Sequence, residues 1–243
     1  MKIAAAQVYS IDGDIPKNSA IHLSAIEKAA EVNVDYVVFP ELSLTGYDLE
    51  KSAKLAMTTN DLLLNPFRNA AILHRITIGI GAPLLENNMP KIGLIVISET
   101  GEVESYAKVH LHSGEAAFFT EGKAYQTLTI KNTIIANAIC ADINHASHVA
   151  ACAALGAGVY LAGVLLREQA YQADTDLLKA NAKDRGLIIG IANHNRPTGG
   201  WIPCGRSAFW SGDRLLASAE GTENVLVTAE KTEAGWIGSV TPL

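Results

Sequence analysis

A cysteine at the end of an apolar segment is the first residue of this sequence that could do chemistry. Residues 134–148 contain an apolar strand pattern that ends at Cys140, and residues 141–144 lead into a helical pattern. A thiol at a strand-to-helix turn lies near unpaired backbone N–H groups and the positive end of the helix dipole, and both favour the thiolate. Cys140 is therefore a candidate nucleophile. The alternative is a small buried apolar residue, the more common role of a cysteine in a core.

Three further polar residues follow predicted strands or share a loop with aromatic side chains. Glu41 comes after the strand predicted for residues 36–39, at the edge where open α/β sheets bind their ligands. Lys108 follows the strand predicted for residues 103–107, and Glu115 lies in a loop with two phenylalanines. A carboxylate and an ammonium group beside a thiol would supply a proton acceptor and a positive charge for acyl chemistry. Each residue also has an ordinary explanation, as a solvated acid or a solubilising lysine.

The histidines offer two alternative kinds of site. One of them could act as the base for Cys140, as in cysteine peptidases, and pairs of them could bind zinc. The zinc site would combine two residues at a strand end with two residues of a predicted helix. Such spacings are common by chance, so both kinds of site stay as alternatives. The histidines concerned are His110, His112, His145, His148 and His194.

The elements that must position these residues alternate between strands and helices. We expect a strand at residues 2–9, a helix at residues 14–32 that begins with Asp14 and Pro16, and a strand at residues 36–39. The further expected strands are residues 76–80, 92–98, 103–107, 128–130, 133–139, 159–166 and 187–193, and the further expected helices are residues 60–75, 145–155 and 169–185.

The arrangement of these elements favours a layered α/β fold. Helices between strands indicate a parallel or mixed sheet, and hairpins indicate antiparallel pairing at its margins. We therefore expect two packed sheets with helices outside. In the helix at residues 60–75, the leucines at 62–64 and Ile72 are expected to face inward. Two final strands should flank residues 211–213, with little tail beyond Thr228.

Length and composition indicate a single globular domain that covers residues 1–243. The chain is 49% hydrophobic and 18% charged, which suits a substantial core and excludes a disordered chain. It has 19 Lys and Arg against 25 Asp and Glu, which gives a net charge of −6 at pH 7. This charge disfavours nucleic acid and anionic membranes as partners. The sequence contains no linker, internal repeat or low-complexity segment.

Three features favour a cytoplasmic location. The three cysteines are too few for a disulfide framework, which indicates a reducing compartment. Gln7 and Tyr9 interrupt the apolar run that a signal peptide would need. The uncharged stretch at residues 149–166 approaches the length of a membrane span, but its Ala- and Gly-rich middle fits a helix end followed by a buried strand. We therefore expect no membrane association.

The candidate residues occur in short motifs whose order resembles that of a known enzyme family. The motifs are Phe39-Pro40-Glu41, Lys108-Val109-His110-Leu111 with Gly114-Glu115, and Cys140-Ala141-Asp142. In this order, and on predicted elements of the matching kind, they resemble the carbon-nitrogen hydrolase family, also called the nitrilase superfamily. The resemblance covers nearly the whole chain, from the first predicted strand to a closing hairpin around residues 207–213.

The resemblance implies a fold and a role for each candidate residue. The implied fold is a four-layer α-β-β-α sandwich of two packed mixed sheets with helices outside. Cys140 would be the nucleophile, and Glu41 would be the general base. Lys108 and the backbone N–H of Ala141 would hold the oxyanion, with Glu115 as an accessory acid. The family needs no metal ion or organic cofactor and usually forms dimers, so a homodimer is expected.

The implied reaction is hydrolysis of a non-peptide C–N bond in a small amide or carbamoyl compound. It would pass through a cysteine thioester and release ammonia or an amine. Acyl transfer and nitrile hydrolysis at the same site are alternatives, as is a catalytically silent scaffold. Many members continue after Cys-x-Asp with an Arg-Phe-Pro-Glu-like run, whereas this chain has Ile143-Asn144-His145-Ala146-Ser147. This departure bears on the substrate more than on the reaction.

Overall fold

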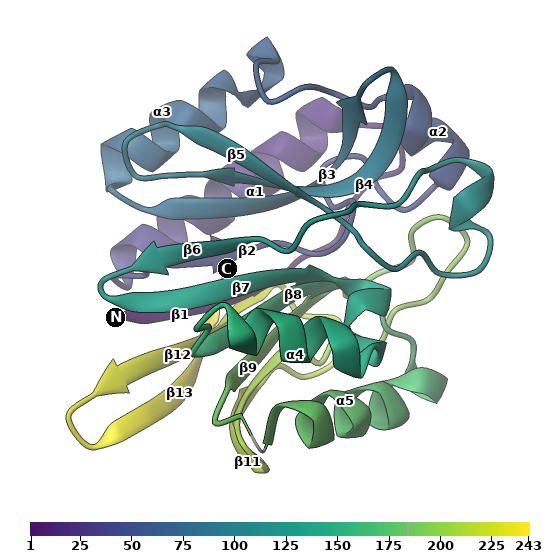
Figure 1. Cartoon of the computed structure of the whole chain (residues 1–243). Coiled ribbons are helices and arrows are strands. Elements are labelled where there is room, and N and C mark those ends of the chain that lie inside the picture. The colour runs from purple at the N-terminus through teal and green to yellow at the C-terminus, as the bar shows by residue number, and fades with distance from the viewer. Residues whose placement is uncertain (184) are drawn as a thin grey trace.

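Two β-sheets and their covering helices form the described part of the protein, residues 1–183 and 185–243 of the computed structural model (Figure 1). Within these residues, one sheet has seven strands in the order β13-β12-β1-β2-β3-β4-β5, and the other has six in the order β11-β10-β9-β8-β7-β6. The strands are β1 (Lys2–Gln7), β2 (Tyr36–Val38), β3 (Thr77–Glu86), β4 (Met89–Ile97), β5 (Val103–Ala107), β6 (Thr127–Ile130), β7 (Thr133–Ile139), β8 (Val159–Val164), β9 (Ile188–Asn193), β10 (Ala208–Ser211), β11 (Arg214–Ser218), β12 (Val225–Thr232) and β13 (Gly235–Pro242). The helices are α1 (Ile15–Glu31), α2 (Leu49–Lys54), α3 (Asn65–His74), α4 (Ala146–Ala154) and α5 (Glu168–Lys183), with short 3₁₀ helices η1 (Leu62–Leu64), η2 (Glu115–Ala117) and η3 (Cys140–Asn144).

Side chains on the first sheet alternate between two cores. In β1, Ile3 and Ala5 belong to the core between the two sheets, whereas Ala4 and Ala6 belong to the core under α1 and α3. This is the alternation that a strand covered on both faces requires. The first sheet is therefore covered by helices on one face and by the second sheet on the other.

The second sheet repeats this arrangement on the opposite side. In β7, Ile135 and Ile139 face the first sheet, and Ala136 and Ala138 belong to the core under α4 and α5. Figure 1 shows α1 and α3 on one side of the paired sheets and α4 and α5 on the other. The four-layer α-β-β-α sandwich expected from the sequence is confirmed.

The structure confirms one of two predicted helices and divides the other. The prediction for α1 is confirmed, because the Asp14 side chain accepts a hydrogen bond from the backbone N–H of Lys17 and Pro16 lies in the first turn. The helix predicted at residues 60–75, with Pro66 as the residue expected to shorten or kink it, is divided into η1 and α3. Asp61 caps η1, and Pro66 lies in the first turn of the separate helix α3. Proline lacks the N–H that a helix interior needs, so the chain restarts a helix there.

The inward orientation expected in this segment is correct only in part. Leu64 is fully buried, whereas Leu62, Leu63 and Ile72 are exposed by 77%, 46% and 52%. The break between η1 and α3 changes the direction of the side chains that follow it. A prediction based on one uninterrupted helix over residues 60–75 therefore gave the wrong orientation for most of these side chains.

The C-terminal part contains two strands that the sequence analysis missed. β12 pairs antiparallel with β1 from Lys2↔Glu230 to Gln7↔Val225, and β13 pairs with β12. The expectation of little tail beyond Thr228 is thus wrong. Because β12 joins the open edge of β1, its apolar first half, Val225 to Ala229, is buried between helices and the second sheet.

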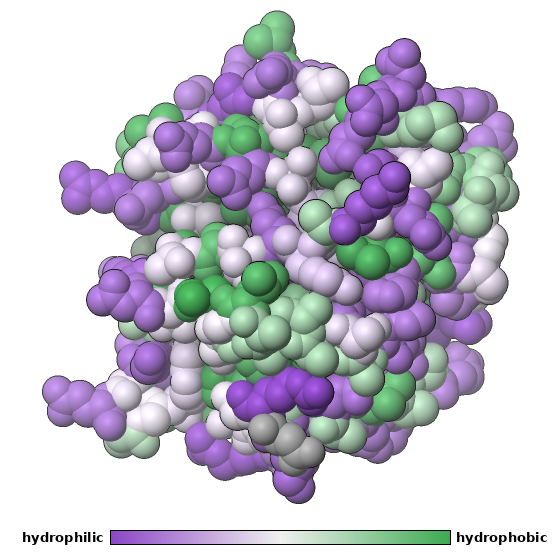
Figure 2. All heavy atoms as spheres, in the orientation of Figure 1, coloured by the Kyte–Doolittle hydropathy of each residue, from purple (hydrophilic) through white to green (hydrophobic). Residues whose placement is uncertain are grey.

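The uncharged stretch at residues 149–166 divides into the end of α4 and the buried strand β8, as expected. None of the described helices combines the length and the apolar character that a membrane span requires. On the face shown in Figure 2, hydrophobic side chains lie interspersed with polar ones. The apolar residues of the chain are concentrated instead in the three buried cores.

Candidate active site

Four of the candidate residues come together at one end of the two sheets. Glu41 follows β2, Lys108 follows β5 and Cys140 follows β7, so strands of both sheets end at this cluster. Glu115 begins η2, in the loop after Lys108. The charges of both glutamates and of the lysine act on the Cys140 thiol. Packing of the two sheets therefore joins side chains that lie far apart in the sequence.

The ammonium group of Lys108 is at the centre of the cluster. Its Nζ atom donates to Oε1 of Glu41 at 2.6 Å and to both carboxylate oxygens of Glu115 at 2.8 Å. All three residues are fully buried. A buried charge is stable only when it is paired and hydrogen-bonded, and these acceptors match the three N–H groups of an ammonium. Lys108 is therefore not a solubilising lysine.

The charge state of Lys108 is fixed by its neighbours. Burial acts to lower the pKa of Lys108, but the charges of Glu41, Cys140 and Glu115 together outweigh it and hold the pKa above its ordinary value. Glu115 is itself held by the Tyr47 hydroxyl, which donates to Oε1 at 2.5 Å, and by a backbone N–H that donates to Oε2 at 2.6 Å. The lysine stays cationic, and Glu115 is its fixed partner.

Glu41 lies in a loop that is clamped between the two sheets. A Cβ atom at Gly81 of β3 or at Gly163 of β8 would collide with carbonyl oxygens of this loop, so only glycine fits at both positions. Nε2 of His194 donates to the Glu41 carbonyl oxygen at 2.7 Å. Because a carbonyl can only accept, this contact identifies the Nε2–H tautomer of His194. The backbone that carries the Glu41 carboxylate is therefore rigid.

The Glu41 carboxyl group has one free oxygen and a raised pKa. Its Oε2 atom is buried and has no hydrogen-bond partner among the described residues, and the Cys140 thiol is the neighbour placed to supply one. Burial raises the pKa of Glu41 to about 7, against the opposing effect of Lys108. A group with such a pKa accepts and returns protons readily near neutral pH.

Cys140 forms the turn between β7 and η3. Its φ of 41° is unusual for a residue other than glycine and costs about 1–3 kcal/mol. Its Sγ lies 3.8 Å from the carbonyl oxygen of Leu165. Burial, followed by the charge of Glu41, raises the pKa of the Cys140 thiol well above its ordinary value. The expectation that the turn favours the thiolate is thus wrong for the resting site, because burial and the charge of Glu41 both disfavour the charged thiol.

A buried carboxylate that the sequence analysis did not single out supports this turn. Oδ2 of Asp142 accepts from the Ile139 N–H at 3.0 Å and from the Tyr106 hydroxyl at 2.6 Å. Its Oδ1 accepts from the His110 N–H at 2.9 Å. An acidic residue in the first turn of a helix is the sequence signal that could have identified Asp142 as a cap.

Two small cavities open onto Cys140. Their volumes are about 50 Å³ and 190 Å³, and both are lined by His112, Cys140, Leu165 and Arg167. The smaller one also contacts Tyr47 and Trp201. The larger one also contacts Ala141, Asn144, Leu166, Ala170 and Asp174. The site therefore admits only a small molecule.

A comparison with known families assigns the chain to one of them. The profile of the carbon-nitrogen hydrolase family matches residues 2–230. The chain belongs to the carbon-nitrogen hydrolase family. An (R)-stereoselective amidase from Pseudomonas sp. is 26% identical over 162 residues, which are 66% of this chain and 59% of that protein. The match thus spans about three fifths of the length of this curated relative.

Solved structures of one amidase are similar to this carbon-nitrogen hydrolase. The amidase from Nesterenkonia sp. AN1 is 26% identical and has a TM-score of 0.87, over 96% of this chain and 94% of the other. In a glutamate-to-leucine variant of that amidase, the acetamide moiety of fluoroacetamide is covalently added at the active-site cysteine (TM-score 0.86, 94% and 89% covered). A cysteine-to-alanine variant of it is in complex with butyramide.

Apart from His112, which lines both cavities together with Cys140, the histidines considered from the sequence contact other groups of this family member. His110 and His145 stack at 3.7 Å between ring centroids, and His148 contacts the Tyr106 hydroxyl at 2.7 Å. His194 holds the backbone of Glu41. Across residues 1–183 and 185–243, no three His, Cys, Asp or Glu side chains are arranged to hold a metal ion. His145, part of the run that departs from the family pattern, thus packs beside the site.

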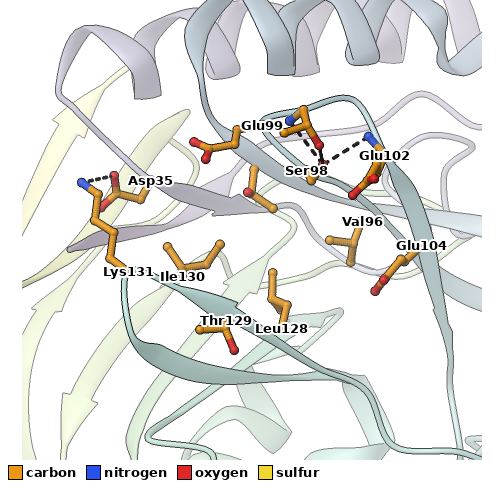
Figure 3. A pocket seen from close by; sticks show the side chains of 12 residues that line it. Asp35, Val96, Ser98, Glu99, Glu102, Glu104, Leu128, Thr129, Ile130 and Lys131 are labelled. Carbon is orange, nitrogen blue, oxygen red and sulfur yellow. Dashed lines mark hydrogen bonds and ion pairs between the residues drawn. The ribbon is translucent and has the colours of Figure 1, made fainter.

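A wider cavity lies at the opposite end of the sheets (Figure 3). Its volume is about 370 Å³, and Asp35, just before β2, and Lys131, in the β6–β7 turn, form an ion pair at its rim. Glu99, Glu102 and three apolar side chains add to its lining. Its lining includes neither a cysteine nor a buried lysine, unlike the cluster around Cys140.

Proposed function

We propose that the protein hydrolyses the C–N bond of a small non-peptide amide or carbamoyl compound through a thioester on Cys140. One observation carries this proposal: Lys108 binds both Glu41 and Glu115 beside the thiol, and Glu41 keeps a free oxygen. A nucleophile, a base and a fixed positive charge are the three groups that cleavage of an unactivated amide needs.

In the first step, Glu41 accepts the proton of the Cys140 thiol. The raised pKa of the thiol means that the proton leaves only when a base removes it, and the free Oε2 atom of Glu41 is that base. The sulfur then forms a bond to the carbonyl carbon of the substrate, and the π electrons move to the carbonyl oxygen. The product is a tetrahedral intermediate with an oxyanion.

Lys108 and the backbone N–H of Ala141 hold this oxyanion. In the resting site every ammonium N–H of Lys108 has a carboxylate acceptor. Protonation of Glu41 weakens its bond to Lys108, and one ammonium N–H becomes available as the oxyanion forms. The N–H of Ala141 lies in the first turn of η3, where helix N–H groups have no intrahelical acceptor. Both donors thus act mainly in the transition state.

In the second half of the reaction, Glu41 returns the proton to the leaving nitrogen. The C–N bond breaks, ammonia or an amine departs, and the acyl group remains as a thioester on Cys140. Glu41 then takes a proton from water, the hydroxide attacks the thioester, the C–S bond breaks to release the acid, and Glu41 returns the proton to the Cys140 sulfur. Glu115 keeps Lys108 in place throughout, because its carboxylate receives two of the lysine contacts.

The similar proteins support this assignment. The Pseudomonas relative is an amidase, and the Nesterenkonia amidase carries covalent chemistry at its active-site cysteine. Butyramide, which binds a variant of the Nesterenkonia amidase, is a small amide. A small amide is therefore the first substrate class to examine.

Ammonia release from a panel of small amides, carbamoyl compounds and nitriles tests the proposal. We expect release from amides or carbamoyl compounds, and an acyl-enzyme mass on Cys140 after acid quenching. Cys140→Ala should abolish both signals, whereas Cys204→Ala, at a half-buried cysteine outside both cavities, should retain them. An active Cys140→Ala protein would overturn the assignment. Interception of the thioester by added amines would indicate acyl transfer.

We also propose that the chain acts as one domain, in the cytoplasm and as a homodimer. The core between the two sheets contains residues of both, which supports a single folding unit. All three cysteines are free in the described part of the chain, which suits a reducing compartment. Sedimentation analysis tests the assembly, and a monomer at micromolar concentration would contradict the homodimer.

A further inference from the structure

Arg167 lies where the two cavities at Cys140 meet. It follows β8 and lines both cavities together with the thiol. Its guanidinium carbon is 4.4 Å from the centre of the Trp201 ring, which also lines the smaller cavity. An arginine stacked on an aromatic face is restricted to few orientations. The guanidinium group of Arg167 is thus held in the wall of the cavities that lead to the Cys140 thiol.

The charge of Arg167 is not balanced by a carboxylate. Among the residues that the structure describes, it forms no ion pair, whereas Arg206, which also stacks on an aromatic ring, pairs with Glu168 at 3.0 Å. Lys108, the other cation near Cys140, already has carboxylate acceptors for its N–H groups. Arg167 therefore has donors available for a ligand in the cavities.

The other walls of the cavities are compatible with an anionic ligand. Leu165 and Trp201 contribute apolar and aromatic surface. Asp174 is the acidic residue of the larger cavity, and burial raises its pKa, against the opposing effect of a hydrogen bond to Asn144. Asp174 does not line the smaller cavity. Arg167 thus lines both cavities, whereas Asp174 lines only the larger one.

We propose that Arg167 binds a carboxylate group of the substrate, so that the enzyme prefers small amides with an anionic end. This inference rests on the proposed amide hydrolysis. The planar guanidinium offers two parallel N–H donors that match a carboxylate, a geometry that lysine cannot provide. Cavities of about 50 Å³ and 190 Å³ restrict the rest of the molecule to a few carbon atoms.

The carboxylate can belong to either side of the scissile bond. On the acyl side the substrate is a monoamide of a short dicarboxylic acid, and on the amine side it is an N-acyl or N-carbamoyl amino acid. In both cases the C–N bond breaks, water supplies the new oxygen of the acid, and the nitrogen leaves as ammonia or an amine. Recognition by Arg167 has the same chemistry in the two cases.

Steady-state kinetics with matched pairs of substrates test the proposal. Succinamate with butyramide examines the acyl side, and N-acetylglycine with N-propylacetamide examines the amine side. We expect kcat/KM for the anionic member of one pair to be higher by about tenfold to a hundredfold, the usual value of hydrogen bonds to a charged group. Arg167→Met should reduce kcat/KM for that member by about tenfold more than for its neutral partner.

A matched variant controls for the loss of a stacked arginine. Arg196 lies 4.4 Å over the ring of Tyr9 and lines neither cavity, so Arg196→Met should keep the wild-type preference. Succinate should also protect Cys140 from alkylation by iodoacetamide, and this protection should weaken in Arg167→Met. The protection assay does not depend on turnover.

The outcomes separate this inference from the proposed function. Equal kcat/KM for both members of every pair overturns the role of Arg167 but leaves amide hydrolysis intact. A preference for a cationic analogue such as 4-aminobutyramide does the same and points to Asp174 instead. No ammonia or amine release from any compound overturns both proposals.

Discussion

The carboxylate of Asp142 accepts a hydrogen bond from the backbone N–H of His110 at 2.9 Å. His110 comes two residues after Lys108, and Asp142 comes two residues after Cys140. The same carboxylate also accepts from the N–H of Ile139, which precedes the cysteine. One buried side chain thus ties the turn that presents the thiol to the segment that presents the ammonium group.

Replacement of the Asp142 carboxylate should reduce activity although Asp142 is not one of the proposed reacting groups. Asp142→Asn exchanges an acceptor oxygen for an NH₂ group that faces N–H donors, so we expect the free energy of unfolding to fall by about 1–3 kcal/mol. A shift of the thiol by an ångström should lower kcat by about a hundredfold. Urea denaturation and steady-state kinetics measure the two effects.

A milder variant separates positioning from stability. Tyr106→Phe removes one hydrogen bond to Asp142 and the contact with His148, so it should lower the free energy of unfolding by about 1–3 kcal/mol and leave the two backbone contacts of Asp142 in place. Its kcat should therefore exceed that of Asp142→Asn. Normal kcat in Asp142→Asn would show that the turn does not need this support.

Removal of the buried ammonium should affect both turnover and stability. Lys108→Met leaves two buried carboxylates without their cation, so we expect the free energy of unfolding at pH 8 to fall by about 3–5 kcal/mol. Loss of an oxyanion donor should lower kcat by about 10²–10³ or more. Because Lys108 opposes the rise in the pKa of Glu41, that pKa should increase further in the variant. Activity within tenfold of wild type would exclude Lys108 from the oxyanion site.

The parts of this site that sequence alone could predict are those with a local signal. Cys140 ends an apolar run before a polar helix start, and Asp14 and Pro16 begin α1 as their types require. Lys108 gave no such signal, because a lysine after a hairpin strand is usually exposed. Its partner Glu41 follows β2 of the same sheet, and the strand order β2-β3-β4-β5, which brings the two residues to one end of that sheet, is a long-range feature.

The parts that sequence could not predict depend on long-range packing. β12 was missed in the sequence, and its place inside the sheet depends on pairing with β1 on one side and β13 on the other. The polar contacts of Tyr47 and His194 involve residues 68 and 153 positions away in the chain. The raised pKa of Cys140 follows from burial and from the charge of Glu41, a residue far away in the sequence. Local pattern therefore located the candidate nucleophile but not its charge state.

The fit of the Glu41 loop against β8 should be sensitive to a single methyl group. A Cβ at position 163 would lie 2.5 Å from the carbonyl oxygen of Phe39, so Gly163→Ala must displace either the strand or the loop. We expect a loss of about 1–3 kcal/mol in the free energy of unfolding, together with reduced kcat, because Glu41 moves with the loop.

A second glycine next to the same strand provides the control. A Cβ at Gly158 would lie 3.8 Å from its nearest neighbour atom, the Cγ2 of Thr133, which is ordinary van der Waals contact. Gly158→Ala should therefore change neither kcat nor stability by more than about 0.5 kcal/mol. Equal effects of the two substitutions would show that the loop is not held by close packing at position 163.

Activity should rise with pH through the pKa of Glu41. Burial raises that pKa from 4.5 to about 7, and only the ionised carboxylate can accept the thiol proton. We therefore expect kcat/KM to fall about tenfold for each pH unit below 7, as for a single essential base. The measured midpoint belongs to the coupled set of Glu41, Lys108 and Glu115. A flat profile between pH 5 and 8 would contradict Glu41 as the base.

The same ionisation should change stability in the opposite direction. Between pH 4.5 and 7 the folded protein keeps a proton on Glu41 that the unfolded chain has lost, because the pKa of Glu41 is higher in the folded state. Folding therefore takes up a proton in this window, and the contribution of Glu41 to the free energy of unfolding must fall as pH rises. Glu41→Gln cannot ionise and should remove this contribution. Chemical denaturation of both proteins at pH 5 and pH 7.5 measures this contribution. Relative to Glu41→Gln, the wild type should have a lower free energy of unfolding at pH 7.5 than at pH 5.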